Sequence, residues 1–332
     1  MSSAPSTSIV VPAYNAAATI RRCLEALRGA TVPGTEIVVV DDGSTDDTAA
    51  LAAAKGARVV RLDGNRGPGA ARNRGAREAH GGVLVFVDSD VAVAPDAIGR
   101  AERTFAETDV AAVFGSYDAE PAAPGLVSRF RNLLHHWVHQ TSSRDAFTFW
   151  AGLGAIRRPV FDAVGGFDER GQAMVVEDVE LGHRVCAAGH RIRLDPAMQG
   201  THLKRWTLAS MIRTDVLHRA IPWGRTLLVS GPIPQDLNLD GGQRWSVALT
   251  GVIGVALAAA LWQPRLLAAA AGALGVIVVL NRRFYDFLAR QRGLLFALAS
   301  IPLHLVYFAC AGLGFGYAWL ETRRGRTGGR AA

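Results

Sequence analysis

The sequence predicts an α/β protein with a doubly wound, mostly parallel sheet, followed by C-terminal transmembrane helices. Two observations predict the sheet: short, unbroken apolar runs recur in the first half of the chain, and stretches with helical spacing of apolar residues separate them. The third observation concerns residues 245–320, which consist largely of long apolar runs. At 332 residues, the chain is long enough for about two domains.

Each expected strand ends at a polar turn. Ser8–Val11 is the first strand and stops at Pro12, Glu36–Val40 is the second, and a third begins at Val59. Val83–Val87 is the fourth, and its unbroken apolar character indicates a strand that is buried on both faces. Because helices are expected between these strands, the alternation favours parallel pairing.

Two later stretches, Leu126–Gln140 and Met211–Leu228, are amphipathic and carry basic and aromatic residues. In the first stretch lie three closely spaced histidines: His135, His136 and His139. Their spacing could form a metal site, but an interfacial helix explains it equally well. The second stretch contains Trp223, a residue type that anchors helices at the level of lipid headgroups.

The charge is divided unevenly along the chain. Residues 1–120 carry 12 basic and 16 acidic side chains, whereas residues 121–332 carry 24 basic and 13 acidic ones. A basic face could bind nucleic acid, but anionic lipid headgroups suit the apolar C-terminal region better. The three cysteines are too few and too scattered for a disulfide framework or a zinc site, which favours a reducing compartment.

Three apolar segments are candidates for membrane helices: Ser246–Leu261, Leu266–Leu280 and Leu294–Leu320. A spanning helix needs about 20 residues, so the first two are short and could instead form a hairpin in one leaflet. By the positive-inside rule, the arginine-rich loop at 282–292 should be cytoplasmic, and so should residues 1–240, because two crossings separate them from that loop. A third crossing would place the arginines of the C-terminal tail outside, so the number of crossings stays open. We therefore expect a multi-pass protein of the cell membrane.

Two carboxylates end the fourth strand, because Asp88 and Asp90 follow Val87 directly as D-S-D. Open α/β sheets bind ligands at the carboxyl ends of their strands. A D-x-D pair offers hard oxygen ligands to Mg²⁺ or Mn²⁺, which commonly share their shell with substrate phosphates. Without further signals, turn-forming residues that cap a strand would explain the pattern as well.

Further motifs accompany this pair in a fixed order along the chain: V-P-A-Y-N at 11–15, V-V-D-D-G-S-T-D at 39–46, G-x-x-x-A-R-N-x-G at 67–75, F-V-D-S-D at 86–90, V-G-G-F-D-E at 164–169, V-E-D-V-E-L-G-H-R at 176–184 and H-L-K-R-W at 202–206. With these motifs the chain resembles a family 2 glycosyltransferase of the GT-A fold, over roughly residues 8–210. The expected parts are a Rossmann-like, nucleotide-sugar-binding half at 1–120, an acceptor and catalytic half at 121–210, an amphipathic interfacial segment at 211–244, a transmembrane region of two or three segments at 245–320 and a basic tail at 321–332.

The donor site is expected at the ends of the first two strands. Asp41 and Asp42 can accept hydrogen bonds from a base N–H group or from ribose hydroxyls, and the resemblance implies that the matching aspartate holds uracil. The neighbouring donor-site candidates are Pro12, Tyr14 and Asn15. Arg72, after a glycine-rich loop, can meet a diphosphate with its charge, although a solvated surface arginine is the alternative.

The resemblance also implies a general base. It assigns this role to Asp178, the second residue of E-D, which would take the proton from an acceptor hydroxyl. Glu177 is a second catalytic candidate, and one of the acids Glu177, Asp178 and Glu180 could simply cap the following helix.

The H-L-K-R-W stretch resembles the Q-x-x-R-W of membrane-bound synthases except at its first residue. The resemblance places Arg205 and Trp206 beside the diphosphate and the acceptor channel. His202 departs from the pattern, which weakens the case for a processive synthase. The histidine could be a metal ligand beside Asp90 and Asp88, or an ordinary buried side chain.

The function expected from these motifs is inverting, metal-dependent transfer of a sugar from a nucleotide-diphosphate sugar, with uridine as the expected base, to a hydroxyl of a lipid or lipid-linked glycan. The expected partners are thus the nucleotide sugar, Mn²⁺ or Mg²⁺, the acceptor and the membrane, but no nucleic acid. A polyprenyl-phosphate sugar transferase, a processive polysaccharide synthase and a catalytically dead nucleotide-sugar-binding protein remain alternatives.

Overall fold

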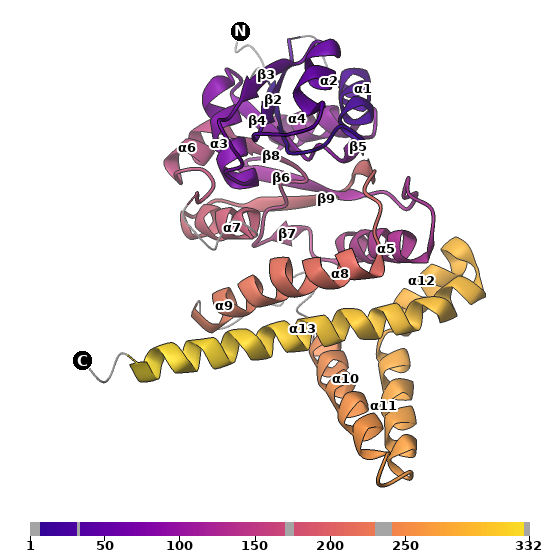
Figure 1. Cartoon of the computed structure of the whole chain (residues 1–332). Coiled ribbons are helices and arrows are strands. Elements are labelled where there is room, and N and C mark those ends of the chain that lie inside the picture. The colour runs from indigo at the N-terminus through magenta and orange to yellow at the C-terminus, as the bar shows by residue number, and fades with distance from the viewer. Residues whose placement is uncertain (1–6, 32–33, 170–175, 230–240, 329–332) are drawn as a thin grey trace. The chain divides into compact units, whose positions relative to one another are not determined.

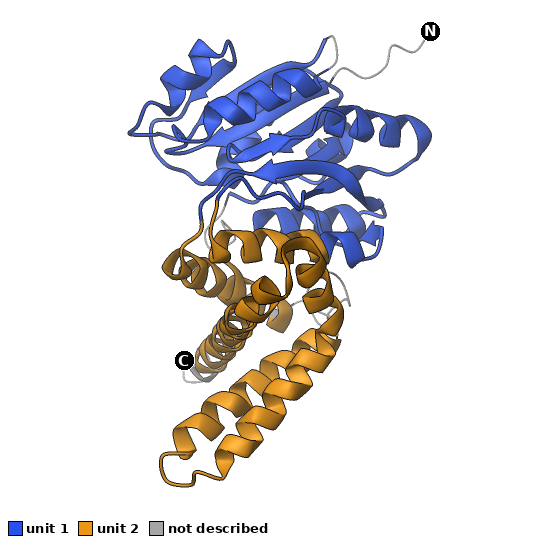
Figure 2. Ribbon diagram, turned by 90° about the vertical axis from the view of Figure 1, so that its right-hand side faces the viewer, with its two compact units in different colours: residues 1–123, 138–205 blue, residues 124–137, 206–332 orange. Residues whose placement is uncertain are grey.

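The computed structural model describes residues 7–31, 34–169, 176–229 and 241–328, with side chains up to residue 324. By internal packing the chain forms two compact units, shown in Figure 2. The first comprises residues 1–123 and 138–205, and the second comprises residues 124–137 and 206–332. Most of the expected donor and acceptor halves falls within the first unit. Their separate roles stay a prediction, and the expected segments 211–244 and 321–332 lie partly outside the described residues.

The first unit is built on one sheet with the order β3-β2-β1-β4-β8-β6-β9-β5, and β7 pairs with β9. Its strands are β1 (Thr7–Ala13), β2 (Glu36–Asp41), β3 (Arg58–Arg61), β4 (Val83–Val87), β5 (Val91–Val93), β6 (Ala112–Tyr117), β7 (Asp145–Ala146), β8 (Leu153–Arg157) and β9 (Ile192–His202). The first four strands in this order pair in parallel, and the antiparallel strand β8 joins them to the rest. The sheet is therefore mixed, with a parallel N-terminal half.

Helices cover both faces of this sheet (Figure 1). The helices of the first unit are α1 (Ile20–Ala30), α2 (Thr48–Ala54), α3 (Pro68–Glu78), α4 (Ala97–Glu107), α6 (Arg158–Ala163) and α7 (Glu177–Ala187). Along β4, Val83, Val85 and Val87 enter the core under α1 and α4, whereas the alternate residues Leu84 and Phe86 enter the core under α3, α6 and α7. The predicted doubly wound fold, with strands buried on both faces, is confirmed.

The first strand is longer than the sequence predicts. Pro12 does not stop β1 but lies inside it, opposite Val40 of β2. The pairing of β1 with β4 already ends at Val10 and Phe86, so Pro12 is paired on one side only. Its missing N–H group is tolerated for that reason.

The helix α3 packs closely on this sheet at Gly75, where an added Cβ would lie 2.2 Å from Cγ1 of Val10. We expect Gly75→Ala to lower the free energy of unfolding by about 1–3 kcal/mol through overpacking. Gly29→Ala is the matched control, since an added Cβ there meets nothing within 4 Å, and it should stabilise α1 by about 0.5–1 kcal/mol. Thermal unfolding of both variants tests the difference, and equal midpoints would contradict it.

The second unit is helical. It contains residues 126–137 of α5 (Leu126–Thr141), then α8 (Leu208–Asp215), the π-helix η2 (Val216–Ala220), α9 (Ile221–Val229), α10 (Gly241–Ala259), α11 (Leu266–Leu280), α12 (Arg282–Arg292) and α13 (Leu294–Gly328). Within the described residues, one helix is long and apolar enough to cross a membrane, Leu294–Arg324, with a mean hydropathy of 2.0. The helices α11 and α12 pass the same test only as a pair, which is bent by 71°.

The arginine-rich stretch 282–292, expected as a loop, is the helix α12. Its sequence is amphipathic, because Phe284, Phe287 and Leu288 are buried on one side while Arg282 and Arg290 are exposed on the other. Packing of this apolar face makes a helix out of a segment that the charges alone would mark as a loop.

Candidate active site

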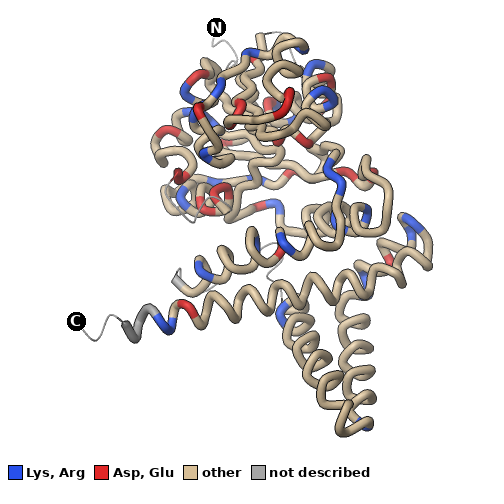
Figure 3. The backbone as a smooth tube through the Cα atoms, viewed as in Figure 1, with Lys and Arg blue, Asp and Glu red and all other residues tan. Residues whose placement is uncertain are grey.

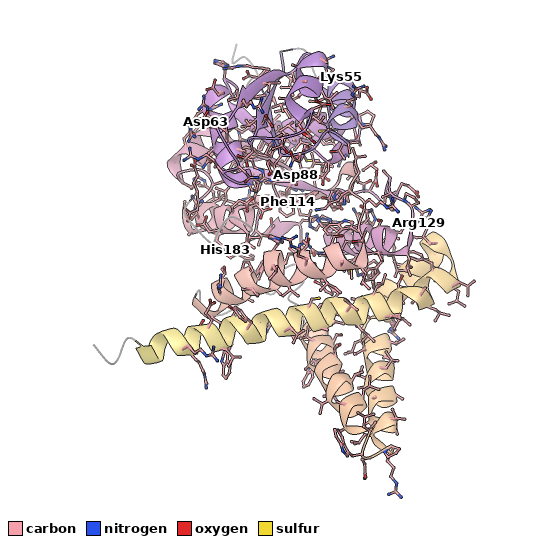
Figure 4. The ribbon with its side chains drawn as sticks, viewed as in Figure 1. Lys55, Asp63, Asp88, Phe114, Arg129 and His183 are labelled. Atoms are coloured by element: carbon pink, nitrogen blue, oxygen red, sulfur yellow. The ribbon has the colours of Figure 1, made fainter. Side chains whose placement is uncertain are left out.

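The turn between β4 and β5 forms the centre of the candidate site. The N–H group of Asp88 donates to the carbonyl of Gly152 at 3.1 Å, and the carbonyl of Asp88 accepts from the N–H of Val91 at 3.0 Å. These bonds fix the backbone between the two aspartates of D-S-D. In the view of Figure 4, Asp88 lies near the middle of the α/β unit and Lys55 near its edge.

Arg72 of α3 bonds to two carboxylates at once. Its Nη2 donates to Oδ1 of Asp88 at 2.7 Å, and its Nη1 donates to Oε1 of Glu177 at 2.6 Å. The guanidinium is buried and lies 5.4 Å from the ring centroid of Phe167. Sequence reasoning expected Arg72 to meet a diphosphate. The structure instead gives it a bridging position between the D-S-D turn and α7, and its contact with a diphosphate stays a prediction.

Removal of this guanidinium should be costly. In Arg72→Met, the carboxylates of Asp88 and Glu177 lose their shared cation, so we expect a loss of about 3–5 kcal/mol in the free energy of unfolding. Arg74→Met is the control, because Arg74 forms a partly exposed pair with Glu78 that contributes about 0–1 kcal/mol. The thermal midpoints of the two variants are compared. A loss of stability in Arg72→Met no greater than that in Arg74→Met would show that the buried ion pairs of Arg72 do not stabilise the fold.

Asp90 and His202 lie side by side, as the sequence suggested. Nε2 of His202 is 3.5 Å from Oδ2 of Asp90, because β5 pairs with β9 in a register that sets Val91 opposite His202. The imidazole stacks on Tyr117 with a centroid distance of 4.3 Å. Burial alone would raise the pKa of Asp90, but His202 and then Lys204 hold it below its ordinary value. Asp90 therefore keeps a negative charge next to an imidazole.

Asp90 and His202 could supply two of the ligands of a metal ion. No group of three or more His, Cys, Asp or Glu side chains within the described ranges is arranged to hold an ion. The Oδ1 atom of Asp88 is bonded to Arg72. A carboxylate and an imidazole from the protein still suit Mn²⁺ or Mg²⁺ when a diphosphate supplies further oxygens. Asp90 and His202 are thus the better candidates, because one carboxylate oxygen of Asp88 is already bonded to Arg72.

Asp178 and Glu177 begin α7 but have different surroundings. Glu177 is buried and bonded to Arg72, and burial raises its pKa, although Arg72 opposes the shift and Asp178 adds to it. Asp178 is half-buried, and its Oδ2 and Oδ1 atoms accept from the N–H groups of Ala151 at 3.2 Å and Val179 at 2.8 Å. The helix N-terminus stabilises its negative charge. Asp178 is therefore the more accessible of the two carboxylates for proton transfer.

Asp41, the last residue of β2, and Asp42 bond to the loops around the end of that strand. The Oδ1 and Oδ2 atoms of Asp42 accept from the N–H groups of Arg66 at 2.8 Å and Gly67 at 2.9 Å, so Asp42 fixes the start of the glycine-rich loop. Burial raises the pKa of Asp42, although these two bonds oppose the shift. Asp41 is buried as well, with Oδ2 at 3.2 Å from Nε of Arg61. Both residues have structural partners, and their binding of a base or ribose stays a prediction.

The loop after β1 is joined to the loop after β2. Asn15 has a positive φ of 48°, and its Oδ1 accepts from the N–H of Thr45 at 2.9 Å. The N–H of Asn15 in turn donates to Oγ of Ser44 at 2.9 Å. The preceding Tyr14 is exposed and Pro12 is buried in the strand. Of the candidates in V-P-A-Y-N, Tyr14 and Asn15 are thus exposed, whereas Pro12 is not.

The two residues expected at the diphosphate from H-L-K-R-W fall in different units. Arg205 is exposed at the end of the first unit. Trp206 is buried in the second, where its N–H donates to Oγ of Ser128 at 2.9 Å and Arg131 lies 5.8 Å from its ring centroid. Trp206 is packed as a core residue there, and its role at the donor stays a prediction.

Sequence reasoning missed the side chains that hold the V-G-G-F-D-E loop. Asn73 exchanges two hydrogen bonds with the backbone of Phe167, at 2.8 and 2.9 Å. Arg184 donates to the carbonyl of Gly166 at 2.6 Å and pairs with Glu180. Asn73 lies in the motif at 67–75 and Arg184 in the motif at 176–184. Their positions in motifs that contain Arg72 and Asp178 were the signal that could have found them.

Comparisons with known proteins agree with this geometry. The chain is similar to a solved mannosyltransferase, PcManGT from Pyrobaculum calidifontis, described as a complex with GDP-Man and Mn²⁺. The TM-score is 0.63 at 24% identity, with 90% of this chain and 88% of that one covered. The chain therefore has the GT-A fold. Residues 8–165 match the family model described as glycosyl transferase family 2, so the chain contains a domain of that family.

Two curated relatives show how far the similarity extends. One is the succinoglycan biosynthesis protein ExoO of Rhizobium meliloti, 48% identical over 102 residues, which cover 29% of this chain and 28% of that protein. The chain thus matches well under half of this relative's length. The other is the O-antigen chain rhamnosyltransferase RfbN of Salmonella typhimurium, 25% identical over 276 residues, which cover 78% of this chain and 84% of that protein.

Proposed function

We propose that the chain transfers a sugar from a nucleotide-diphosphate sugar to a hydroxyl group, in a metal-dependent reaction that inverts the anomeric configuration. One observation carries this proposal: Arg72 bonds to Asp88 of the D-S-D turn and to Glu177, the neighbour of Asp178. The buried bridge brings the candidate metal-binding turn and the candidate base into one site. A protein that only binds nucleotide sugars has no use for a base in that position.

In the proposed reaction, Asp178 accepts the proton of the acceptor hydroxyl. The hydroxyl oxygen forms a bond to the anomeric carbon while the bond from that carbon to the diphosphate breaks, and the leaving nucleotide keeps the electron pair. A divalent ion bound by Asp90 and His202 would offset the charge on the leaving diphosphate. Because the nucleophile attacks opposite the leaving group in a single displacement, the configuration inverts.

We propose that the acceptor is a lipid or a lipid-linked glycan at the cytoplasmic face of the cell membrane. The C-terminal helix that is apolar enough to cross a membrane supports the location. The arginines of α12 favour a location of α12 on the cytoplasmic side of the membrane. The two curated relatives are named for an O-antigen chain and for succinoglycan, which supports a glycan product.

Donor binding tests the proposal. The full chain in detergent is titrated with a panel of uridine-, guanosine- and thymidine-diphosphate sugars, with Mn²⁺ and with EDTA. We expect one nucleotide class to bind, and to bind more tightly with Mn²⁺. Absence of binding by every member of the panel in both conditions would contradict the proposed donor.

A further inference from the structure

The helices α10 and α11 form a hairpin whose surface is apolar on nearly every side. Only a narrow seam is buried between its helices, at Ser246, Ala256, Ala270, Ala273 and Ile277. Large apolar side chains elsewhere on it are exposed, among them Val255 at 71% and Trp262 at 81%. In Figure 3 the hairpin carries charges only near its base and its tip. A helix that is apolar all round and uncovered by protein requires lipid around it.

The long apolar helix α13 runs crosswise to this hairpin within the second unit (Figures 1 and 2). If the hairpin enters a bilayer along its normal, α13 must lie near the plane of the membrane. If α13 crosses the bilayer instead, the apolar hairpin must lie along its surface. The surroundings of α13 distinguish the two arrangements.

One face of α13 packs against helices that carry charged residues. Near its middle, Tyr307 lies over Arg131, which forms a buried ion pair with Asp215 of α8 at 2.5 Å. Farther along, Arg225 of α9 makes a bidentate ion pair with Glu321 at 2.7 and 2.9 Å. The helices α8, η2, α9 and α12 all contact α13.

The exposed arginines of those neighbouring helices decide between the arrangements. Arg213 and Arg219 are exposed on α8 and η2, and Arg282 and Arg290 are exposed on α12. A crossing α13 would carry these neighbours toward the hydrocarbon, where arginine is strongly disfavoured. At the membrane surface the same side chains meet water and anionic headgroups.

The opposite face of α13 is exposed and apolar. Along it lie Leu295, Leu298, Leu313, Tyr317 and Leu320. One charged, protein-covered face and one bare apolar face are the two sides of a helix that lies in an interface. Apolar composition alone therefore overstates the tendency of this helix to cross.

We propose that α13 lies in the plane of the membrane with its bare face in one leaflet, and that the α10–α11 hairpin alone penetrates the bilayer core. The partner of this surface is a lipid bilayer with anionic headgroups. Both ends of the hairpin then lie on one side, together with the arginines of α12 and the basic end of α13, as the positive-inside rule requires. The proposal is independent of the glycosyl-transfer reaction.

Depth measurements along α13 test this arrangement. Single cysteines replace Leu295, Leu313 or Leu320 in the full chain, with the native Cys23, Cys186 and Cys310 changed to Ala. Val255→Cys on the hairpin serves as the reference. Each cysteine carries a nitroxide, and its depth in phosphatidylcholine–phosphatidylglycerol vesicles is read from the ratio of its accessibility to oxygen and to a water-soluble nickel complex. A reporter fused after Ala332 of the unchanged chain gives the side of the C-terminus in cells.

We expect the three α13 positions to lie at similar depths, about 5–10 Å into the boundary between headgroups and acyl chains, with position 255 deeper. The C-terminal reporter should lie in the cytoplasm. If position 313 lies much deeper in the bilayer than positions 295 and 320, α13 crosses the membrane and the proposal is overturned. A reporter outside the cell would show the same. Full exposure of all four positions to the nickel complex would overturn it as well.

Discussion

Asp178→Asn should lower turnover by about 10²–10⁴-fold while the affinity for the nucleotide sugar stays unchanged. A hydroxyl is a weak nucleophile at neutral pH, so its attack depends on a base that removes the proton. The substitution keeps an oxygen that can accept from the N–H of Ala151, so the local structure should persist. The measurement is turnover at saturating donor, together with a binding titration of the same variant.

Glu180→Gln is the matched control for this experiment. Glu180 lies in the same first turn of α7, but its carboxylate is paired with Arg184. We therefore expect a much smaller change in turnover than for Asp178→Asn. If Asp178→Asn transfers sugar at nearly the wild-type rate, a lipid phosphate, which is already an anion, becomes the better acceptor and the assignment of the base fails.

Chelation of divalent metal should abolish transfer, and Mn²⁺ or Mg²⁺ should restore it. Asp90→Ala removes the carboxylate beside His202 and should lower turnover by about 10²–10³-fold, a loss that added metal does not reverse. Negative charge develops on the leaving diphosphate, and without the metal ion the protein alone would have to offset it.

Asp96→Ala provides the control for the loss of a carboxylate in the same region. Its side chain is exposed and 3.9 Å from Arg100, one turn later in the sequence. We expect turnover close to that of the unchanged chain. Full activity in EDTA would contradict a metal-dependent reaction, and equal losses in Asp90→Ala and Asp96→Ala would contradict a special role of Asp90.

The sequence predicted those parts of the fold that depend on local pattern. The apolar run Val83–Val87 was sufficient to place a strand buried on both faces, because each residue of such a strand must enter one of two cores. The proximity of His202 to Asp90 was also suggested beforehand, by the resemblance of H-L-K-R-W to the Q-x-x-R-W pattern, in which histidine replaces glutamine. Pro12 was misjudged, because the tolerance of a proline depends on which neighbouring strand its missing N–H would face.

The partners of Arg72 could not be predicted in the same way. Its guanidinium meets Asp88 and Glu177, which lie 16 and 105 residues away in the sequence. Those contacts depend on the packing of α3 and α7 against one face of the sheet, and no local pattern encodes it. The helix α12 shows the same difficulty, because its charges suggest a loop and only its buried aromatic face produces a helix.

The anomeric configuration of the product tests the central claim most directly. The full chain is incubated with the nucleotide sugar that binds, with Mn²⁺ and with membranes that contain the acceptor, and the glycosidic linkage of the product is determined by NMR spectroscopy. A single displacement assisted by Asp178 predicts that a sugar linked α to the nucleotide appears in β linkage to a hydroxyl oxygen. A product that retains the donor configuration would contradict the account.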